Sequence, residues 1–266
     1  MHPTNCLNCG SNLNGYKFCP ACGQKAATHR LTFHELWHDI LHYFTHADKG
    51  IFHLVGELAV RPGVVAREYV AGKRAKYFKP VNFFLVVGTF VVFMISYFHL
   101  PTDSLVKQME QAAASSNDAV RQKQLAGMAE RTRQVYHYIG KYTNVMNMLI
   151  TPLYAFIFWL FYKKARYSYI EHLVAGLYFI SFIMLVNSLL VVPWQSKLSL
   201  SKMNWLFSLA YVVVDIIYRS FAYRQFMGKK GAGPFFKAMG ISVFTLLLWV
   251  IGSYILLQAY IMTGFE

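Results

Sequence analysis

Long apolar stretches limit most strongly how this chain can fold. Five of them approach or exceed the roughly 17 to 25 residues that cross the hydrocarbon core of a bilayer. These stretches are 81–99, 144–161, 172–192, 204–218 and 239–262, of which the fourth is the shortest. Because a backbone inside lipid must satisfy its own hydrogen bonds, each stretch is predicted to be a helix. The predicted fold class is therefore an all-α transmembrane helical bundle of about five spans.

The distribution of basic residues predicts the orientation of this bundle. The chain is 56% hydrophobic and only 14% charged, unlike an ordinary soluble domain. Of its 26 Lys and Arg residues, 18 fall in segments 1–80, 163–171 and 219–237, and the other 8 fall in 100–143 and 194–203. The positive-inside rule therefore places the N-terminus in the cytoplasm and the C-terminus outside. The net charge of +14 flanks the spans, so we expect anionic lipid headgroups as partners and no nucleic acid.

All four cysteines lie in the phrase "CLNCGSNLNGYKFCPACG" near the N-terminus. Two C-x-x-C pairs, each followed by glycine, form knuckles that can turn four thiolates toward one ion. Such a tetrahedral site has no open coordination position, so Cys6, Cys9, Cys19 and Cys22 are predicted to hold a structural Zn²⁺. Two disulfides, redox thiols and iron in the same cage are the alternatives. A closed site does not catalyse hydrolysis, which favours a docking or stabilising module.

The next segment, "HELWHDILHYFTHADKG", repeats histidine at every fourth position. On a helix this spacing places one histidine stripe opposite a face of Phe, Leu, Trp and Ile side chains. A second metal site could form here, and its candidate ligands are His34, His38, His42, His46, Glu35 and Glu57. A solvated or lipid-facing polar stripe is the simpler interpretation, and we favour it.

Residues 34–38 also match the H-E-x-x-H pattern of zinc metalloproteases, with Glu35 as the base that activates water. Eighteen residues separate His38 from Glu57, which resembles the H-E-x-x-H-x18-E arrangement of gluzincin aminopeptidases. Those enzymes hold the motif in a large catalytic domain. Here only about fifty residues separate the ribbon from the first span, and none of them has the pattern of a strand. The sequence therefore disfavours catalysis.

A basic hinge follows. Residues 51–60 are apolar, Pro62 and Gly63 interrupt the helix, and residues 64–71 resume it until Gly72. "KRAKYFKP" then adds cations and aromatics directly before the first span, a pattern typical of a segment in the headgroup plane. The predicted lipid-phosphate ligands are Arg61, Arg67, Lys73, Arg74 and Lys76. Ordinary positive-inside anchoring is the alternative.

Two pairs of polar residues fall at the edges of predicted spans. Asp215 and Arg219 are four residues apart and are predicted to form an ion pair. Glu171 and His172 begin the third span, where they could form a proton or metal site with the histidine helix or mark the interface.

The ribbon followed by "HADKG", "RPGVVAREYVAGKR" and "YFKP", together with "YIEHLVAGLYFISF" at the third span, resembles a bacterial family known as domain of unknown function 3667. The resemblance covers most of residues 1–190. It implies a multi-pass protein of the bacterial inner membrane with an N-terminal zinc ribbon. It brings no known activity, cofactor or catalytic residue.

The predicted organisation has three parts: a zinc ribbon at 1–28, cytoplasmic amphipathic and juxtamembrane helices at 29–80, and a transmembrane domain at 81–266 with an external helical loop at 100–143. We expect a non-enzymatic scaffold or regulator that recruits a protein partner through the ribbon. A transporter or metal-handling protein using the histidine stripe, and a membrane metalloprotease, are the alternatives. The sequence leaves the oligomeric state open.

Overall fold

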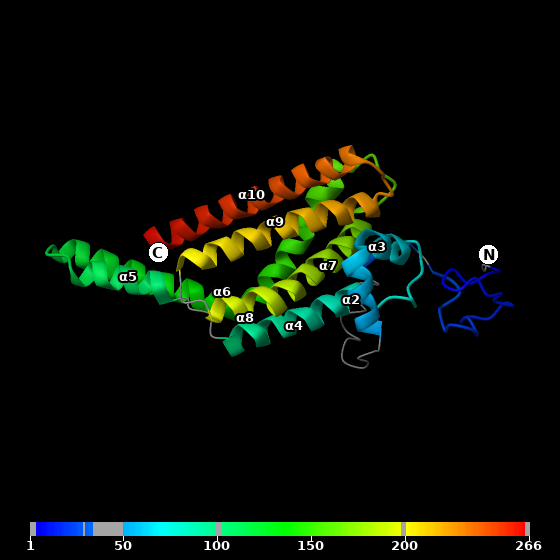
Figure 1. The fold of residues 1–266 in the computed structure, drawn as a ribbon, viewed down its shortest axis with the longest axis horizontal. Coiled ribbons are helices and arrows are strands. Elements are labelled where there is room, and N and C mark those ends of the chain that lie inside the picture. Colours follow the sequence, from blue (N-terminus) through cyan, green and yellow to red (C-terminus); the bar gives the residue numbers. More distant parts are fainter. Residues whose placement is uncertain (1–3, 29, 34–49, 99–102, 198–200, 264–266) are drawn as a thin grey trace.

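The computed structural model describes residues 4–28, 30–33, 50–98, 103–197 and 201–263. Long helices run lengthwise beside one another, and the four-cysteine ribbon lies beyond one end of them (Figure 1). These helices are α4 (Pro80–Phe98), α6 (Ala119–Phe161), α7 (Tyr169–Val186), α9 (Ser201–Phe226) and α10 (Ala232–Thr263). In the described residues β pairing is limited to two isolated bridges in the ribbon. The all-helical fold class is confirmed.

Among the described residues, four helical segments are long and apolar enough to cross a membrane, compared with about five predicted. They are Pro80–Phe98, Tyr169–Trp194, Leu206–Phe226 and Ala232–Met262. The predicted fourth span, the shortest in the sequence, is among them. The predicted second span, 144–161, falls short because the apolar part of its helix is only Met148–Phe161.

This apolar part is about the last third of α6. The whole of α6 nevertheless runs along the bundle (Figure 1). The helix bends at Tyr142, where φ is −112° and ψ is 18°. Its first half is polar and pairs with α5 (Asp103–Ala114) in a hairpin that extends beyond the end of the bundle farthest from the ribbon (Figure 1). Asp118 caps α6 by accepting a hydrogen bond from the backbone N–H of Val120 at 2.9 Å. The cap at Asp118 thus separates α6 from α5 within the predicted external helical loop.

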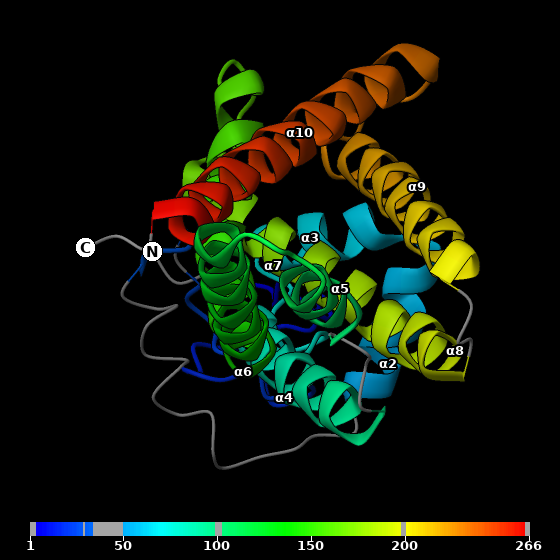
Figure 2. The ribbon, with the colours of Figure 1, turned by 90° about the vertical axis from the view of Figure 1, so that its left-hand side faces the viewer.

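The α7 helix occupies the middle of the bundle, as the end-on view in Figure 2 shows. It contacts α2, α3, α4, α6 and α9. Val174, Ala175, Tyr178 and Phe179 are completely buried, which explains why the sequence of α7 is apolar on all sides. The helix continues as a π-helical turn, Asn187–Val191, and then as α8, Val192–Lys197.

Two short helices, α2 (Gly50–Val60) and α3 (Pro62–Val70), lie at the ribbon end of the bundle (Figure 1). The predicted break at Pro62 and the predicted helix end at Gly72 are confirmed, and Gly72 has a φ of +103°. At Gly63 the backbones of α3 and α9 almost touch, because a Cβ atom there would lie 2.1 Å from the carbonyl oxygen of Ala222. The basic hinge is thereby fixed directly on the bundle.

Candidate metal centre and the basic hinge

The four cysteines form one compact cluster. Their Sγ atoms all lie within 4.8 Å of one another, and all four thiols are free. The Sγ atoms of Cys6 and Cys22 are 3.6 Å apart, and those of Cys9 and Cys19 are 3.5 Å apart. A tetrahedral ion with metal–sulfur bonds of about 2.3 Å would place its sulfurs roughly 3.8 Å apart. The cluster thus has the dimensions of a closed four-sulfur metal site.

The two halves of the ribbon build the same turn twice. The N–H of Gly10 donates to the carbonyl of Cys6, and the N–H of Gly23 donates to the carbonyl of Cys19, both at 2.9 Å. Gly10 and Gly23 have φ angles of +77° and +72°, a conformation that side chains disfavour. The glycine after each C-x-x-C pair is therefore required by the turn that aims the two thiols inward.

Almost all of the ribbon's interior is the cluster itself. Its core consists of Cys6, Leu13, Cys19 and Ala26, with Cys22 packed against them. Hydrogen bonds with Ser11 lower the pKa of the Cys9 thiol to about 6, which favours a thiolate at neutral pH. A core this small supplies little hydrophobic stabilisation, so a bound ion would provide most of the folding energy.

A buried glutamine fastens the ribbon to the hinge. The side chain of Gln24 donates to the carbonyl of Gly72 at 2.9 Å and accepts from the N–H of Ala75 at 3.0 Å. Leu7 packs over Gly72, 3.0 Å from the position of a Cβ atom there. The sequence analysis did not single out Gln24, whose only signal is a polar residue directly after the second knuckle. The hydrogen bonds of Gln24 hold the ribbon against the loop before α4.

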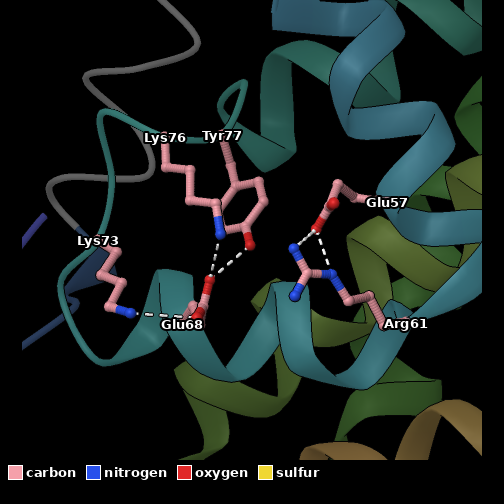
Figure 3. Close-up of polar contacts among 6 residues, drawn as sticks. All are labelled: Glu57, Arg61, Glu68, Lys73, Lys76 and Tyr77. Atoms are coloured by element: carbon pink, nitrogen blue, oxygen red, sulfur yellow. Dashed lines mark hydrogen bonds and ion pairs between the residues drawn. The ribbon is translucent and has the colours of Figure 1, made fainter. Parts of the chain in front are cut away.

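The hinge holds a second polar cluster, centred on Glu68 (Figure 3). Its carboxylate accepts hydrogen bonds from the Nζ atoms of Lys73 at 3.1 Å and Lys76 at 2.8 Å, and from the hydroxyl of Tyr77 at 2.6 Å. Burial acts to raise the pKa of Glu68, but these three donors outweigh it and lower the pKa to about 2. The cluster closes the hinge onto α3.

The predicted headgroup ligands therefore have several different environments. Lys73 and Lys76 point to Glu68, and Arg61 pairs with Glu57 at 2.5 Å (Figure 3). Arg67 donates to the carbonyl of Gln225 at 3.4 Å. Arg74 lines a cavity of about 280 Å³ between the ribbon and the hinge. Within the described residues, carboxylates thus engage at least Lys73, Lys76 and Arg61.

The proposed second metal site is described only in part. Glu57, its most distant candidate ligand, points to Arg61. The other candidates, His34, His38, His42, His46 and Glu35, lie outside the described residues. Within the described part of the chain, the four cysteines form the single cluster of metal-ligating side chains.

Glu171 and His172 lie at the start of α7 and have separate roles. Glu171 accepts two hydrogen bonds from the guanidinium of Arg30, both at 2.9 Å, and so ties the segment after the ribbon to the bundle. His172 is completely buried and stacks on the rings of Tyr162 and Tyr223. The predicted ion pair of Asp215 and Arg219 forms at 2.5 Å.

Residues 48–92 match the sequence model of a family described as protein of unknown function (DUF3667). The predicted resemblance is confirmed in this segment. The DUF3667 segment contains the basic hinge, which includes α2 and α3, and the first part of α4. The ribbon and the motif at the third span lie outside the match. No curated protein and no solved structure matches the chain.

The contacts that fix the end of the bundle are concentrated in the DUF3667 segment. Gly63 provides the close approach to α9, Glu68 gathers the hinge cations, and Gly72 receives the ribbon. The motif "RPGVVAREYVAGKR" therefore has a structural explanation, as a connector between an N-terminal module and the helices of the bundle.

The Glu68 cluster is expected to stabilise the folded protein by an amount that depends on pH. Because the pKa in the folded protein, about 2, lies below the ordinary value of 4.5, ionised Glu68 stabilises the fold above about pH 4.5. This contribution is lost as the pH falls toward 2. We expect Glu68→Gln to lower the free energy of unfolding at pH 7 by on the order of 2 kcal/mol, after allowance for partial exposure of the carboxylate. Thermal unfolding of purified protein in detergent measures the difference.

The control variant is Glu110→Gln, which removes an exposed carboxylate that pairs with Arg133 on the α5–α6 hairpin. It should change the unfolding temperature little at any pH, because exposed ion pairs contribute little. A gap between the wild type and Glu68→Gln that stays constant from pH 7 to pH 3 would contradict the proposed ionisation of Glu68.

Proposed function

We propose that this protein is a non-enzymatic scaffold or regulator of the bacterial inner membrane that recruits a protein partner through a cytoplasmic zinc ribbon. The observation that carries the proposal is the closed four-cysteine cluster, fastened to the DUF3667 hinge through buried Gln24. Zn²⁺ is the ion proposed for the site, because it prefers tetrahedral thiolate ligands in structural sites. With four cysteine ligands, such an ion has no position left for a substrate.

The outward surface of the ribbon supports a role in protein binding. Tyr16 and Phe18 are 62% and 60% exposed, on either side of Lys17. Residues 1–28 contain two lysines and no Asp or Glu. Exposed aromatics beside a cation are typical of residues that contribute most to protein interfaces. The partner proposed here is a protein with an acidic surface around an apolar pocket.

The cytoplasmic location of the ribbon is supported by the positions of the basic segments. The hinge, the turn between α6 and α7, and the turn between α9 and α10 all lie at the ribbon end of the bundle (Figure 1). These turns and the hinge belong to the segments that hold most of the Lys and Arg residues. The positive-inside rule therefore favours this end as the cytoplasmic one, with the α5–α6 hairpin and the C-terminus outside.

The alternative functions depend on the histidine stripe. A transporter or metal-handling protein would use the histidine stripe, and a metalloprotease would use His34 and His38. These histidines lie outside the described residues. Glu57 would be the third protease ligand, yet its carboxylate is held by Arg61. Among these functions, we therefore favour the scaffold or regulator, which is supported by the four-cysteine cluster and its attachment to the hinge.

Site-specific photocrosslinking in cells tests partner recruitment. We expect a benzophenone amino acid at position 16 or 18 to trap the same cytoplasmic protein. We also expect this adduct to disappear when Cys19→Ser is added, because the aromatics then lose their fixed positions. The control position is Tyr138, an exposed residue on the α5–α6 hairpin. Absence of an adduct at both ribbon positions, or an identical adduct from position 138, would contradict the proposal.

A further inference from the structure

A second basic feature lies on the bundle itself, away from the ribbon. A cavity of about 840 Å³ opens between the end of α6 and the start of α10. Its walls carry four lysines, Lys163, Lys164, Lys229 and Lys237, and no described acidic side chain. These four lysines lie on two separate turns, 162–168 and 227–231, and on the first turns of α10. The fold therefore collects at one hollow charges that are far apart in the sequence.

These charges are not compensated within the described chain. None of the four lysines forms an ion pair with a carboxylate of the described residues, whereas Lys73, Lys76 and Arg61 in the hinge all do. Lys237 donates to the carbonyl of Phe161 at 3.2 Å, and its Nζ lies 4.5 Å from the centre of the Tyr162 ring. It is thus held across the cavity wall by neutral groups. Four uncompensated cations around one hollow create a strongly positive potential that an anion would relieve.

The start of α10 adds to this potential. Gly233 and Pro234, in the first turn of the helix, line the cavity. A helix N-terminus carries a partial positive charge, which favours phosphate, and Gly233 has a backbone N–H that can donate to it, whereas Pro234 has none. The lysines and the end of the helix therefore act on the same anion.

The surroundings of the cavity are apolar and indicate an amphiphilic ligand. Leu160 and Phe161 line the cavity and are about half exposed. The Phe161 ring lies 5.9 Å from that of Phe244 on α10, and Phe244 is also about half exposed. Acyl chains could follow this surface into the hydrocarbon layer while the charged group stays at the lysines. A free phosphate would make no use of these side chains.

We propose that this cavity binds the headgroup of an anionic membrane lipid that carries two phosphate groups. Its volume exceeds that of a single phosphate, and four lysines provide more than one cation for each of two phosphates. Basic pockets between transmembrane helices on the cytoplasmic side are known to bind such headgroups. Ordinary positive-inside anchoring would scatter the lysines over the turns and would not require a cavity.

Lipid titration of the full-length protein, followed by native mass spectrometry, tests the proposal. The probe is cardiolipin, whose headgroup has two phosphates. We expect Lys163→Gln, Lys164→Gln, Lys229→Gln and Lys237→Gln together to weaken binding at least tenfold. The control combines Lys17→Gln, Lys107→Gln, Lys123→Gln and Lys230→Gln, which changes the net charge equally. The control should stay within twofold of the wild type, and equal weakening in both variants would overturn the proposal.

A single-residue pair separates a binding defect from a folding defect. Lys229 lines the cavity, whereas its neighbour Lys230 does not, and both are exposed in the same turn. Lys229→Glu should weaken cardiolipin binding severalfold, and Lys230→Glu should leave it nearly unchanged. Identical affinities for these two variants would contradict the site.

Two further probes distinguish a lipid from a soluble anion. Phosphatidylglycerol, with one phosphate, should bind at least fivefold more weakly than cardiolipin. Inorganic pyrophosphate should fail to displace cardiolipin at comparable concentrations, because it has no acyl chains. Displacement by pyrophosphate at equal concentration would assign the cavity to a soluble anion and overturn the lipid proposal.

Discussion

Replacing Gly63 with alanine is expected to separate α3 from α9 and to destabilise the DUF3667 segment strongly. A Cβ atom at this position would lie 2.1 Å from the carbonyl oxygen of Ala222 and 2.3 Å from the backbone nitrogen of Phe226. Both atoms are backbone of one helix, so no side-chain rotation can relieve the clash. The cost should be on the order of 3 kcal/mol, the upper range for overpacked sites. Thermal unfolding in detergent should show this as a lower transition temperature.

Gly56→Ala is the matched control, because Gly56 lies within α2 and nothing is within 4 Å of a Cβ atom there. Alanine favours the helix over glycine, so this variant should be neutral or slightly more stable than the wild type. The Gly63→Ala variant should also expose α3 to proteases, since its hydrogen bond from the Gly63 N–H to Gln225 is lost. An unchanged transition temperature for Gly63→Ala would show that α3 and α9 do not pack in this way.

Segments whose structure depends on local pattern could be predicted from the sequence. Apolar length predicted α4, α7 and α10, and Pro62 and Gly72 predicted both limits of α3. These elements can be predicted locally. Proline and glycine determine their own backbone conformation, and the length of an apolar stretch matches the thickness of a bilayer.

Other features depend on contacts between segments that are distant in the sequence, and local sequence patterns do not predict such contacts. Gly63 was predicted to interrupt a helix, but its main contact is with residues about 160 positions away. The second predicted span is the apolar end of α6, which follows a polar first part and the non-helical residue Tyr142.

The candidate sites divide in the same way. The cysteine cluster could be predicted from the spacing of the cysteines, because each knuckle is formed by five consecutive residues. The hinge cations were recognised, but the carboxylates that engage Lys73, Lys76 and Arg61 were not. The lysines of the α6–α10 cavity were counted only as topology signals, because they come from separate turns that the fold brings together.

Replacing Cys19 with serine should remove the metal and unfold the ribbon, while the helical bundle remains intact. Cys19 supplies one of the four sulfurs and is also buried in the ribbon's small core. Because metal binding provides most of the folding energy of such a module, metal content should fall from about one ion per chain to near none. Elemental analysis measures the ion, and amide hydrogen exchange over residues 4–28 measures the loss of structure. Far-UV circular dichroism should change little, because residues 4–28 contain no helix.

Two controls separate the metal from the docking contact. Ser11→Ala removes the hydroxyl beside Cys9 but no ligand, so it should retain the ion. Gln24→Ala should also retain it, yet faster exchange is expected at Gly72 and Ala75, because the buried side chain that joins ribbon and hinge is lost. The two variants should therefore give different patterns of hydrogen exchange. Cys19→Ser should increase exchange throughout the ribbon, whereas Gln24→Ala should increase it only at the junction with the hinge. Full metal content in the Cys19→Ser variant would place the ion outside the four-cysteine cluster and make the histidine stripe the next site to test.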